Sequence, residues 1–323
     1  ASEPAVPPPL VAPRLDLPMR PIGTASGVLS PHIDFARGGS LYAGTWTAAL
    51  PAVASAEVVV IFGTDHAGSA GRLTPTRQHY STPWGPLPTD LNAVDAVAAA
   101  LGEADAFDEE LHHRREHSIE LAAVWLHWAL RCSGRSAATM PAMIPILCGS
   151  FYPYVQRGAD GARGSPLPEA QTHLAAALTA LQRAIGKRRA LVVSAADLAH
   201  VGPAFGDRTP LDDDAKRRLA RGDDRVLEGA LSGSADAFLD ALRVAEDRTR
   251  VCGLPPTYWA LRLLQHLTAN PVFGRLVGYR QCPADSTFGS VVSIAGVLWE
   301  AELVAGHFSV TRPAARRSAP GSV

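Results

Sequence analysis

The chain has 323 residues, of which 47 % are hydrophobic and 19 % are charged, and its formal charge is −1. This composition predicts a globular protein with a sizeable core and excludes bulk disorder. Acidic and basic residues are mixed along the chain, so no basic stripe for nucleic acid and no polybasic membrane patch is indicated.

The two ends of the sequence differ from its middle. Segment 1–20 is rich in proline and segment 306–323 is small, polar and basic, so both are predicted to be extended or flexible, with one α/β domain over 21–305. A surface loop is predicted at 156–168 from its glycine, proline and serine content. No apolar run reaches the roughly 18–20 residues of a membrane span, and the first residues lack the order of a signal peptide, so we expect a cytoplasmic protein.

Short β-type apolar runs alternate with longer helical patterns along the chain. Strands are predicted at 27–30, 58–62, 143–147, 190–194 and 291–297. Helices are predicted at 39–50, 91–101, 118–131, 169–185, 212–221, 234–245 and 256–268. This alternation predicts a single α/β domain with a largely parallel or mixed central sheet and helices on both faces.

Three of the predicted strands end directly on polar, ligand-type residues. GVLSPH ends at His32, VVVIFGTDH ends at Asp65 and His66, and LVVSAADLAH ends at Asp197 and His200. Ligands of open α/β sheets bind beyond the carboxyl ends of the strands, so these side chains are expected to share one site. Each histidine taken alone is better explained as a hydrogen-bonded residue at a strand end, and only their joint placement favours a shared site.

Two other segments place reactive side chains at the starts of predicted helices. His117 lies in REHSIE at a helix entry, where Ser118 can cap the helix and Glu120 favours its N-terminal dipole. Cys252 precedes a proline-led helix, whose dipole can lower the thiol pKa and favour a thiolate that acts as nucleophile or metal ligand.

The remaining polar residues leave alternatives open. Asp197 and His200 are three residues apart, so a helical turn would let the carboxylate orient the imidazole for acid/base work, whereas the alternative is a capping Asp beside a surface His. Cys132, Cys148 and Cys282 show no paired spacing with each other or with Cys252, which argues against a disulfide framework or a zinc knuckle. We interpret these three as packing residues.

Taken together, these motifs resemble the Memo family, including the protein B component of the AMMECR1–Memo–radical SAM gene group. Through that family the chain resembles the class III (LigB-type) extradiol dioxygenase fold. The matching segments run in family order from about residue 25 to 300 and are SPHIDFARGG, VIFGTDH, HYSTPWGPLPTD, EHSIE, MIPILCG, VVSAADLAHVGPAF, VCGLPPTYWAL and DSTFGSVVSIAGVLW.

The resemblance implies roles for particular residues. It implies metal ligation by His32, His66 and Cys252. It also implies acid/base work by His200 with Asp197 beside it, and a pocket position for His117. This chain departs from the family pattern in having Ile-Asp-Phe at 33–35, where many relatives have Ala-Gly-Tyr, and Asp65, where Ser is common.

The implied ligand set favours soft or borderline metals. The dioxygenases have a carboxylate where this family has cysteine, and two neutral imidazoles with a thiolate suit copper(I), zinc or iron better than magnesium or calcium. We expect one mononuclear metal, with Fe(II) favoured and copper or zinc as alternatives. Three protein ligands leave coordination positions open, as catalytic sites require.

Three functions remain in competition. The first is a non-haem iron oxidoreductase that acts on a small catechol-like molecule, in which His200 moves protons and His117 stabilises negative charge. The second is a non-catalytic metal-binding or interaction protein, since a thiolate alters redox behaviour. The third is a cysteine hydrolase with Cys252 as nucleophile, His200 as base and Asp197 as orienter. Family analogy adds a functional link to AMMECR1-like and radical SAM proteins.

Overall fold

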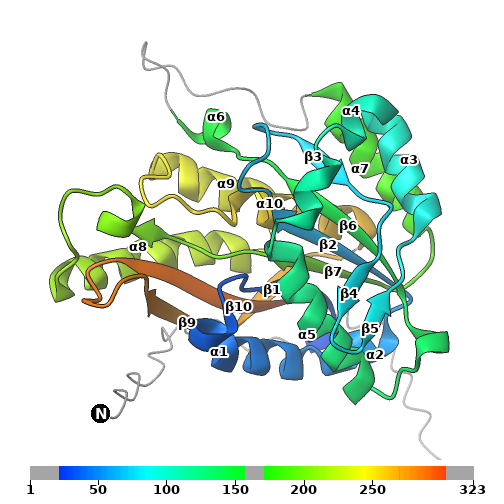
Figure 1. Ribbon diagram of the computed structural model, residues 1–323, viewed down its shortest axis with the longest axis horizontal. Coiled ribbons are helices and arrows are strands. Elements are labelled where there is room, and N and C mark those ends of the chain that lie inside the picture. Colours follow the sequence, from blue (N-terminus) through cyan, green and yellow to red (C-terminus); the bar gives the residue numbers. More distant parts are fainter. Residues whose placement is uncertain (1–21, 157–170, 269, 303–323) are drawn as a thin grey trace, which may run out of the picture.

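The computed structural model describes residues 22–156, 171–268 and 270–302. They form one eight-stranded sheet with helices on both of its faces and a separate two-stranded ribbon (Figure 1), which confirms the expected α/β class. The predicted ends at 1–20 and 306–323, and all but the first residue of the predicted loop at 156–168, lie outside the described residues.

Four parallel strands form the centre of the sheet, in the order β6–β2–β7–β1. They are β1 (Ile22–Ser30), β2 (Val58–Thr64), β6 (Ala142–Cys148) and β7 (Ala190–Ala195). Every residue of β2 is buried, as expected for a strand covered on both faces. The carboxyl ends of all four strands therefore meet at one edge of the sheet.

Antiparallel strands complete the sheet on both sides, which makes it mixed. β3 (Leu73–Pro75) pairs with β6, while β10 (Val291–Glu302) pairs with β1, with β8 (His200–Val201) and with β9 (Val272–Pro283). The separate ribbon consists of two short strands, β4 (Tyr80–Thr82) and β5 (Gly85–Leu87).

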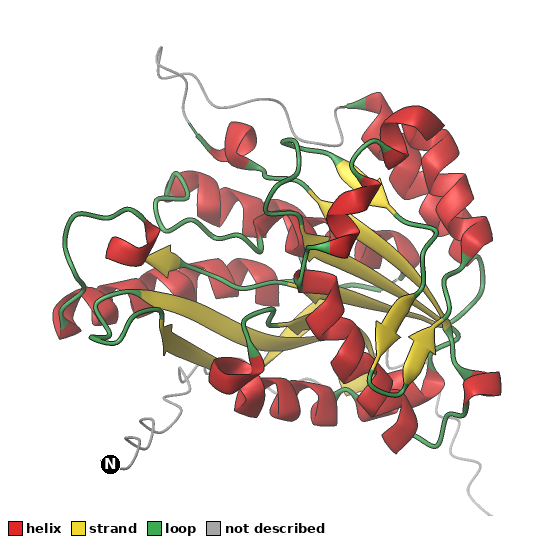
Figure 2. Ribbon diagram, viewed as in Figure 1, coloured by secondary structure: helices red, strands yellow, loops and turns green. Residues whose placement is uncertain are grey.

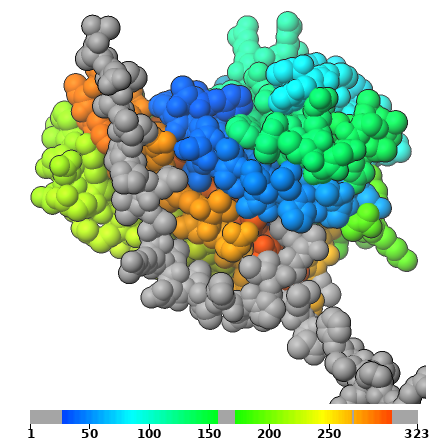
Figure 3. Space-filling view, turned by 90° about the horizontal axis from the view of Figure 1, so that it is seen from below, coloured from blue at the N-terminus to red at the C-terminus, as the bar shows by residue number. Residues whose placement is uncertain are grey.

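Helices cover the two faces of the sheet as separate groups, as Figure 2 shows in red against yellow strands. One face carries α1 (Phe35–Ala48), α2 (Leu50–Ser55) and α5 (Ser118–Cys132). The opposite face carries α3 (Leu91–Leu101), α7 (Thr172–Ile185), α8 (Asp213–Leu231), α9 (Ala235–Val244) and α10 (Leu254–Leu267). Seen from below, α1 and α2 (blue) lie between α5 (green) and β9 (orange) (Figure 3). Shorter helical segments are α4 (Glu103–Phe107), α6 (Tyr152–Val155) and the 3-10 turns Glu110–Arg114, Ala137–Thr139 and Pro203–Phe205.

The alternation of side chains along β2 builds a core on each face. Val58 and Val60 pack in the cluster under α10, whereas Val59 and Ile61 pack in the cluster under α5. Each such fully buried aliphatic side chain contributes about 1.5–3 kcal/mol relative to an exposed one. The fold thereby holds the carboxyl ends of its parallel strands in fixed positions.

Some element boundaries differ from the predictions. The helix predicted at 39–50 starts at Phe35, because the Asp34 side chain accepts a hydrogen bond from the backbone N–H of Arg37 at 3.1 Å and caps the helix there. The helix predicted at 212–221 continues to Leu231, since Val226, Leu227 and other apolar residues of its second half are buried. Across the described ranges, no helix has the length and apolar character that crossing a membrane requires.

Candidate metal centre

The predicted site residues meet at the carboxyl edge of the parallel strands. His32 follows β1, His66 follows β2 and Asp197 follows β7, and these three strands are neighbours in the sheet. Two more segments reach the same edge, with His117 just before α5 and Cys252 just before α10. The structure thus brings the strand ends and the helix entries together at one edge of the sheet, as expected.

His32 is buried and held in a single orientation. Its ring Nδ1 lies 3.0 Å from the carbonyl oxygen of Ala195, and a carbonyl only accepts, so Nδ1 carries the proton. The lone pair of Nε2 is then left facing the Cys252 Sγ at 3.3 Å. Burial, followed by repulsion from His66, lowers the pKa of His32 to about 3, so its imidazole is neutral, as a metal ligand must be.

His66 is oriented in the same way by a carboxylate. Its Nδ1 lies 2.9 Å from Glu116 Oε2, so the ring contacts Glu116 through Nδ1 and not through Nε2. Burial alone would lower the pKa of His66, but the hydrogen bond to Glu116 and the charge of Glu116 outweigh it and raise the pKa. The His32 and His66 ring centroids are 5.2 Å apart.

Cys252 is half-buried, and its thiol is not activated as the sequence suggested. Burial, followed by the negative charge of Asp197, raises the pKa of the Cys252 thiol well above its ordinary value. The predicted lowering by the helix dipole is therefore wrong in direction. A thiol in this environment becomes a thiolate when a cation displaces its proton.

The donor atoms of His32, His66 and Cys252 fit a metal ion. They all lie within 4.8 Å of one another. With metal–nitrogen and metal–sulfur distances of about 2.1 and 2.3 Å, nitrogen and sulfur on one tetrahedral ion are about 3.5 Å apart, and two imidazole centroids are about 5 Å apart. The 3.3 Å between His32 Nε2 and Cys252 Sγ and the 5.2 Å between the ring centroids agree with these values.

Asp197 does not orient His200, contrary to the sequence interpretation. The residues between β7 and β8 are extended rather than helical, since Leu198 and Ala199 donate their N–H groups to the backbone and side chain of Ser293 in β10. The Asp197 carboxylate instead accepts the backbone N–H of His32 at 2.8 Å. Burial raises the pKa of Asp197 to about 6.

His200 is fixed by backbone groups. Its Nδ1 lies 3.1 Å from the Leu198 carbonyl oxygen and 3.2 Å from that of Arg250, so Nδ1 holds the proton and Nε2 is free to accept one. That Nε2 lies 4.0 Å from Cys252 Sγ. Burial lowers the pKa of His200, which keeps the ring neutral.

Glu116 is a residue that the sequence analysis did not single out for function. Its carboxylate accepts the backbone N–H groups of His66, His117 and Ser118 at 3.1, 2.8 and 3.0 Å, besides the His66 ring. Although burial alone would raise its pKa, these hydrogen bonds, with that of the His66 ring first, lower the pKa of Glu116 to about 2. The capping role proposed for Ser118 is thus wrong. Ser118 Oγ donates to the Thr64 carbonyl oxygen at 2.8 Å, and the Glu116 carboxylate accepts the N–H groups of His117 and Ser118 at the helix start.

His117 completes a triangle of imidazoles at the centre. Its ring centroid lies 5.4 Å from that of His32 and 5.3 Å from that of His66, and its plane is nearly parallel to that of His66. Its Nδ1 is 3.2 Å from the second oxygen of Glu116. One carboxylate therefore holds both partly exposed histidines, and a Glu directly before a His at a helix start was the signal available in the sequence.

A neighbouring cluster of Asp65, Glu109 and His112 also has ligand atoms within 4.8 Å of one another. Its members are already paired. Asp65 Oδ2 lies 2.9 Å from His112 Nδ1, while Glu109 accepts from the Ser69 hydroxyl at 2.5 Å and lies 3.5 Å from the Arg72 guanidinium. This cluster is an ion-pair network that ties the turn after β2 to the 3-10 turn at Glu110–Arg114.

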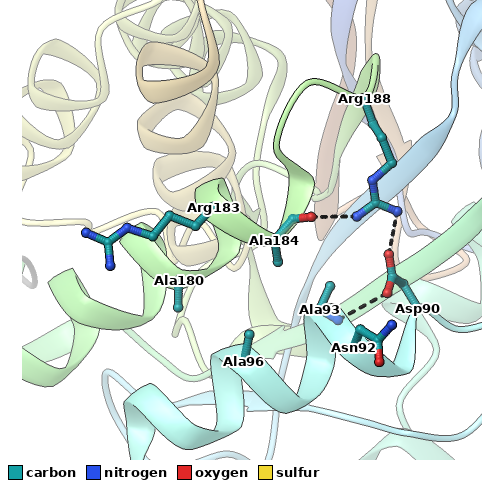
Figure 4. Close-up of a pocket in the computed structure, with 8 residues that line it drawn as sticks. All are labelled: Asp90, Asn92, Ala93, Ala96, Ala180, Arg183, Ala184 and Arg188. Carbon is teal, nitrogen blue, oxygen red and sulfur yellow. Dashed lines mark hydrogen bonds and ion pairs between the residues drawn. The ribbon is translucent and has the colours of Figure 1, made fainter.

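A groove of about 600 Å³ lies elsewhere, between α3 and α7 (Figure 4). Arg188, which precedes β7, bonds Asp90 at 2.6 Å there, so the groove is at the opposite end of the parallel strands from the candidate centre. Its lining residues are Asp90, Asn92, Ala93, Ala96, Ala180, Arg183, Ala184 and Arg188. None of the predicted site residues lines it.

By its fold and its site, the chain is a mixed α/β protein. It carries a His-His-Cys group that could hold a metal at the carboxyl edge of its sheet. The chain belongs to the Memo-like protein family, whose model matches residues 12–152 and 167–298. All of the site residues named above lie within these matched ranges.

Curated relatives carry the same family description. A MEMO1 family protein of Thermus thermophilus is 30 % identical over 251 residues, which is 77 % of this chain and 66 % of that protein. MEMO1 family proteins of Methanosarcina mazei and Methanosarcina acetivorans are 32 % and 30 % identical over 102 and 115 residues. These matches cover 32 % and 36 % of this chain, and 35 % and 39 % of the archaeal proteins.

Proposed function

We propose that the chain holds one mononuclear metal ion on His32, His66 and Cys252. The observation that carries this proposal is that both imidazoles are anchored through Nδ1 to an oxygen acceptor, at 3.0 and 2.9 Å. This arrangement leaves the lone pair of each Nε2 available to a metal. Metal-bound histidines in proteins are commonly held in the same way, by a hydrogen bond from the other ring nitrogen. The Cys252 thiol supplies the third donor beside them.

Among metals, Fe(II) is favoured and copper or zinc are the alternatives. Two neutral imidazoles and a thiolate are borderline to soft donors, which disfavours magnesium and calcium. The His66 and His117 side chains are 39 % and 51 % exposed, so the outer side of the group is open to a small molecule.

We further propose that the protein is an oxidoreductase, similar to extradiol dioxygenases, that acts on a small catechol-like molecule. When bound, the metal would supply Lewis acidity and a site for oxygen chemistry. His200 accepts a proton from a substrate hydroxyl at Nε2, because its Nδ1 proton is held by two carbonyl oxygens. His117 stabilises negative charge from the exposed side, and Asp197 holds the turn that carries His32.

The test is anaerobic purification followed by metal analysis of the native chain and of His32→Ala, and then oxygen uptake with Fe(II)-loaded protein against catechols and aminophenols. We expect about one metal per chain in the native protein and a large loss in the variant. Oxygen uptake should fall in His200→Gln at unchanged metal content. Full metal occupancy without uptake for every compound would contradict the enzymatic part of the proposal.

A non-catalytic metal-binding protein is the second candidate, and the half-buried thiol favours it. Cys252 Sγ lies 3.3 Å from His32 Nε2, and a thiolate beside imidazole donors suits copper(I). Tight copper(I) binding that Cys252→Ser abolishes, with no turnover in any metal form, would support this candidate over the first. A functional link to AMMECR1-like and radical SAM proteins rests on family analogy in either case.

The metal-free cysteine hydrolase has less support. The raised pKa of the Cys252 thiol opposes a resting thiolate, and the Asp197 carboxylate hydrogen-bonds His32 rather than His200. The rate at which iodoacetamide alkylates Cys252 measures directly whether its thiol is activated. Equal, rapid reaction in metal-free and metal-loaded protein would restore this candidate.

A further inference from the structure

Two groups of metal-type donors overlap in a single residue. His32, His66 and Cys252 form one group, and His66, Glu116 and His117 form another, and within each group the ligand atoms lie within 4.8 Å of one another. His66 belongs to both groups. An ion held by the second group is therefore already in contact with one ligand of the first.

The three histidines of the two groups differ in their exposure to solvent, whereas Glu116 beneath them is buried. The His32 side chain is 2 % exposed, whereas those of His66 and His117 are 39 % and 51 % exposed. The three rings lie at the corners of a triangle with sides of 5.2–5.4 Å. An ion that arrives from solvent meets His117 and His66 before it meets His32.

The donors also change in character from the outer group to the inner one. The outer group offers two imidazoles, because both oxygens of Glu116 already accept hydrogen bonds, and imidazole binds many divalent ions. The inner group adds a sulfur donor, and thiolates retain borderline and soft metals more strongly. Affinity thus increases in the direction in which exposure decreases.

We propose that His117 and His66, whose rings the Glu116 carboxylate holds through Nδ1, form a transient entry site that captures a metal ion and passes it to His32 and Cys252. The inference rests on the metal binding proposed above and not on any enzymatic activity. His117 in this role is on the path of the ion and is not one of its final ligands. His117 therefore affects how fast the ion enters and leaves, and not how tightly it is held.

The adjacent cluster of Asp65, Glu109 and His112 supplies a matched control. Its histidine is partly exposed, at 31 % of its side chain, but its carboxylates are paired with His112, Ser69 and Arg72. Asn at position 112 can still donate to Asp65. His112→Asn therefore removes a nearby surface imidazole without touching the two overlapping groups.

The experiment is stopped-flow mixing of the full metal-free chain with cobalt(II), followed by the cobalt–thiolate absorption of the inner group. A chelator chase gives the release rate, and chelator competition gives the Kd. For His117→Asn we expect entry and release rates both to fall on the order of tenfold, with an unchanged Kd, because a higher barrier on the path slows both directions by the same factor. His112→Asn should match the native chain. Asn is a favoured helix N-cap, and His117→Ser provides a second variant that keeps this preference.

Three outcomes overturn the proposal. An unchanged entry rate in both His117 variants removes His117 from the path. A weaker Kd caused by faster release alone makes His117 a resident ligand instead. An equal slowing in His112→Asn makes the effect a general one of surface histidines. Absence of cobalt–thiolate absorption in the native chain is a different failure, because it contradicts the metal function itself.

Discussion

Glu116 Oε2 lies 2.9 Å from Nδ1 of His66, and this contact decides which nitrogen of that ring is left for a metal. The same carboxylate accepts the backbone N–H groups of His117 and Ser118 through its other oxygen. A single buried side chain thereby couples the start of α5 to His66, which follows β2. Its conversion to an amide is the most direct test of the centre's outer contacts.

Glu116→Gln should weaken metal binding by about 10- to 100-fold, the usual effect of losing an outer partner of a ligand histidine. Glutamine has one acceptor oxygen, so its amide group must face either the His66 ring or the N–H groups of the helix start. The loss of those bonds should also lower the free energy of unfolding by about 1–3 kcal/mol. Chelator competition and chemical denaturation measure the two effects.

Glu120→Gln is the matched control for that variant, because Glu120 is exposed in the first turn of the same helix. It should leave the metal affinity unchanged. If Glu116→Gln and Glu120→Gln bound metal equally well, the orienting role of Glu116 would be wrong.

Cys252→Ser should reduce copper(I) affinity far more than Fe(II) affinity, since a hydroxyl is a harder donor than a thiolate. The metal–thiolate absorption should disappear in every metal form. Cys132 is exposed at the end of α5, so the packing role predicted for it is wrong, and Cys132→Ser serves as the control that should keep both affinities. Equal losses for copper(I) and Fe(II) would mean that the sulfur does not select the metal.

Asp65→Ser, which removes the carboxylate beside His112, should lower the pKa of His112. The hydrogen bond between Asp65 and His112 raises that pKa by stabilising the protonated ring. The stability that this pair contributes is present below the ordinary histidine pKa and is lost as pH rises through the raised value. NMR titration of the His112 ring measures the shift, and an unshifted titration would show that the contact is not populated in solution.

Asp223 should make the protein less stable as pH rises from about 4 to about 6. It is buried and accepts a hydrogen bond from the Tyr279 hydroxyl at 2.7 Å, and burial raises its pKa from 3.8 to about 6. The unfolded chain therefore loses this proton at a lower pH than the folded chain does. The penalty reaches about 2–3 kcal/mol above pH 6, where both forms are ionised.

The measurement for Asp223 is the free energy of unfolding of Asp223→Asn against pH, compared with Asp224→Asn. Asp197 and Asp247 also have pKa values raised to about 6, so the slope of the native chain has several sources and only differences between variants are informative. The Asp223→Asn curve should be flatter between pH 4 and 6 than the Asp224→Asn curve. Parallel curves for the two variants would show that Asp223 is not the group that titrates in this pH range.

Elements whose signals are local could be predicted from the residue pattern. Apolar runs at 58–62 and 190–194 lie within buried strands, and the helix predicted at 91–101 is α3 with the same limits. The positions of His32 and His66 just beyond strands follow from the same reasoning. Because parallel strands end at one edge, their gathering could be expected from sequence alone.

Elements and contacts that depend on distant partners could not be predicted from the residue pattern. β9 contains Gly274, Gly278 and two arginines, which hide its strand pattern, and it is held by pairing along its whole length with β10. The direction of the Cys252 pKa shift depends on burial and on Asp197, 55 residues away. Neither influence leaves a local pattern in the chain.

The candidate centre shows the same difference between what the local sequence predicts and what packing decides. Asp197 bonds the backbone of His32, 165 residues away, and not the nearby His200, because β10 holds the intervening segment extended. Glu116 lies 50 residues from His66, and their contact exists only because α5 begins beside the end of β2. Residue types and spacing determined which side chains reach the edge of the sheet. Packing alone decided which of them hydrogen-bond one another, since each bond requires two chain segments to be held within about 3 Å.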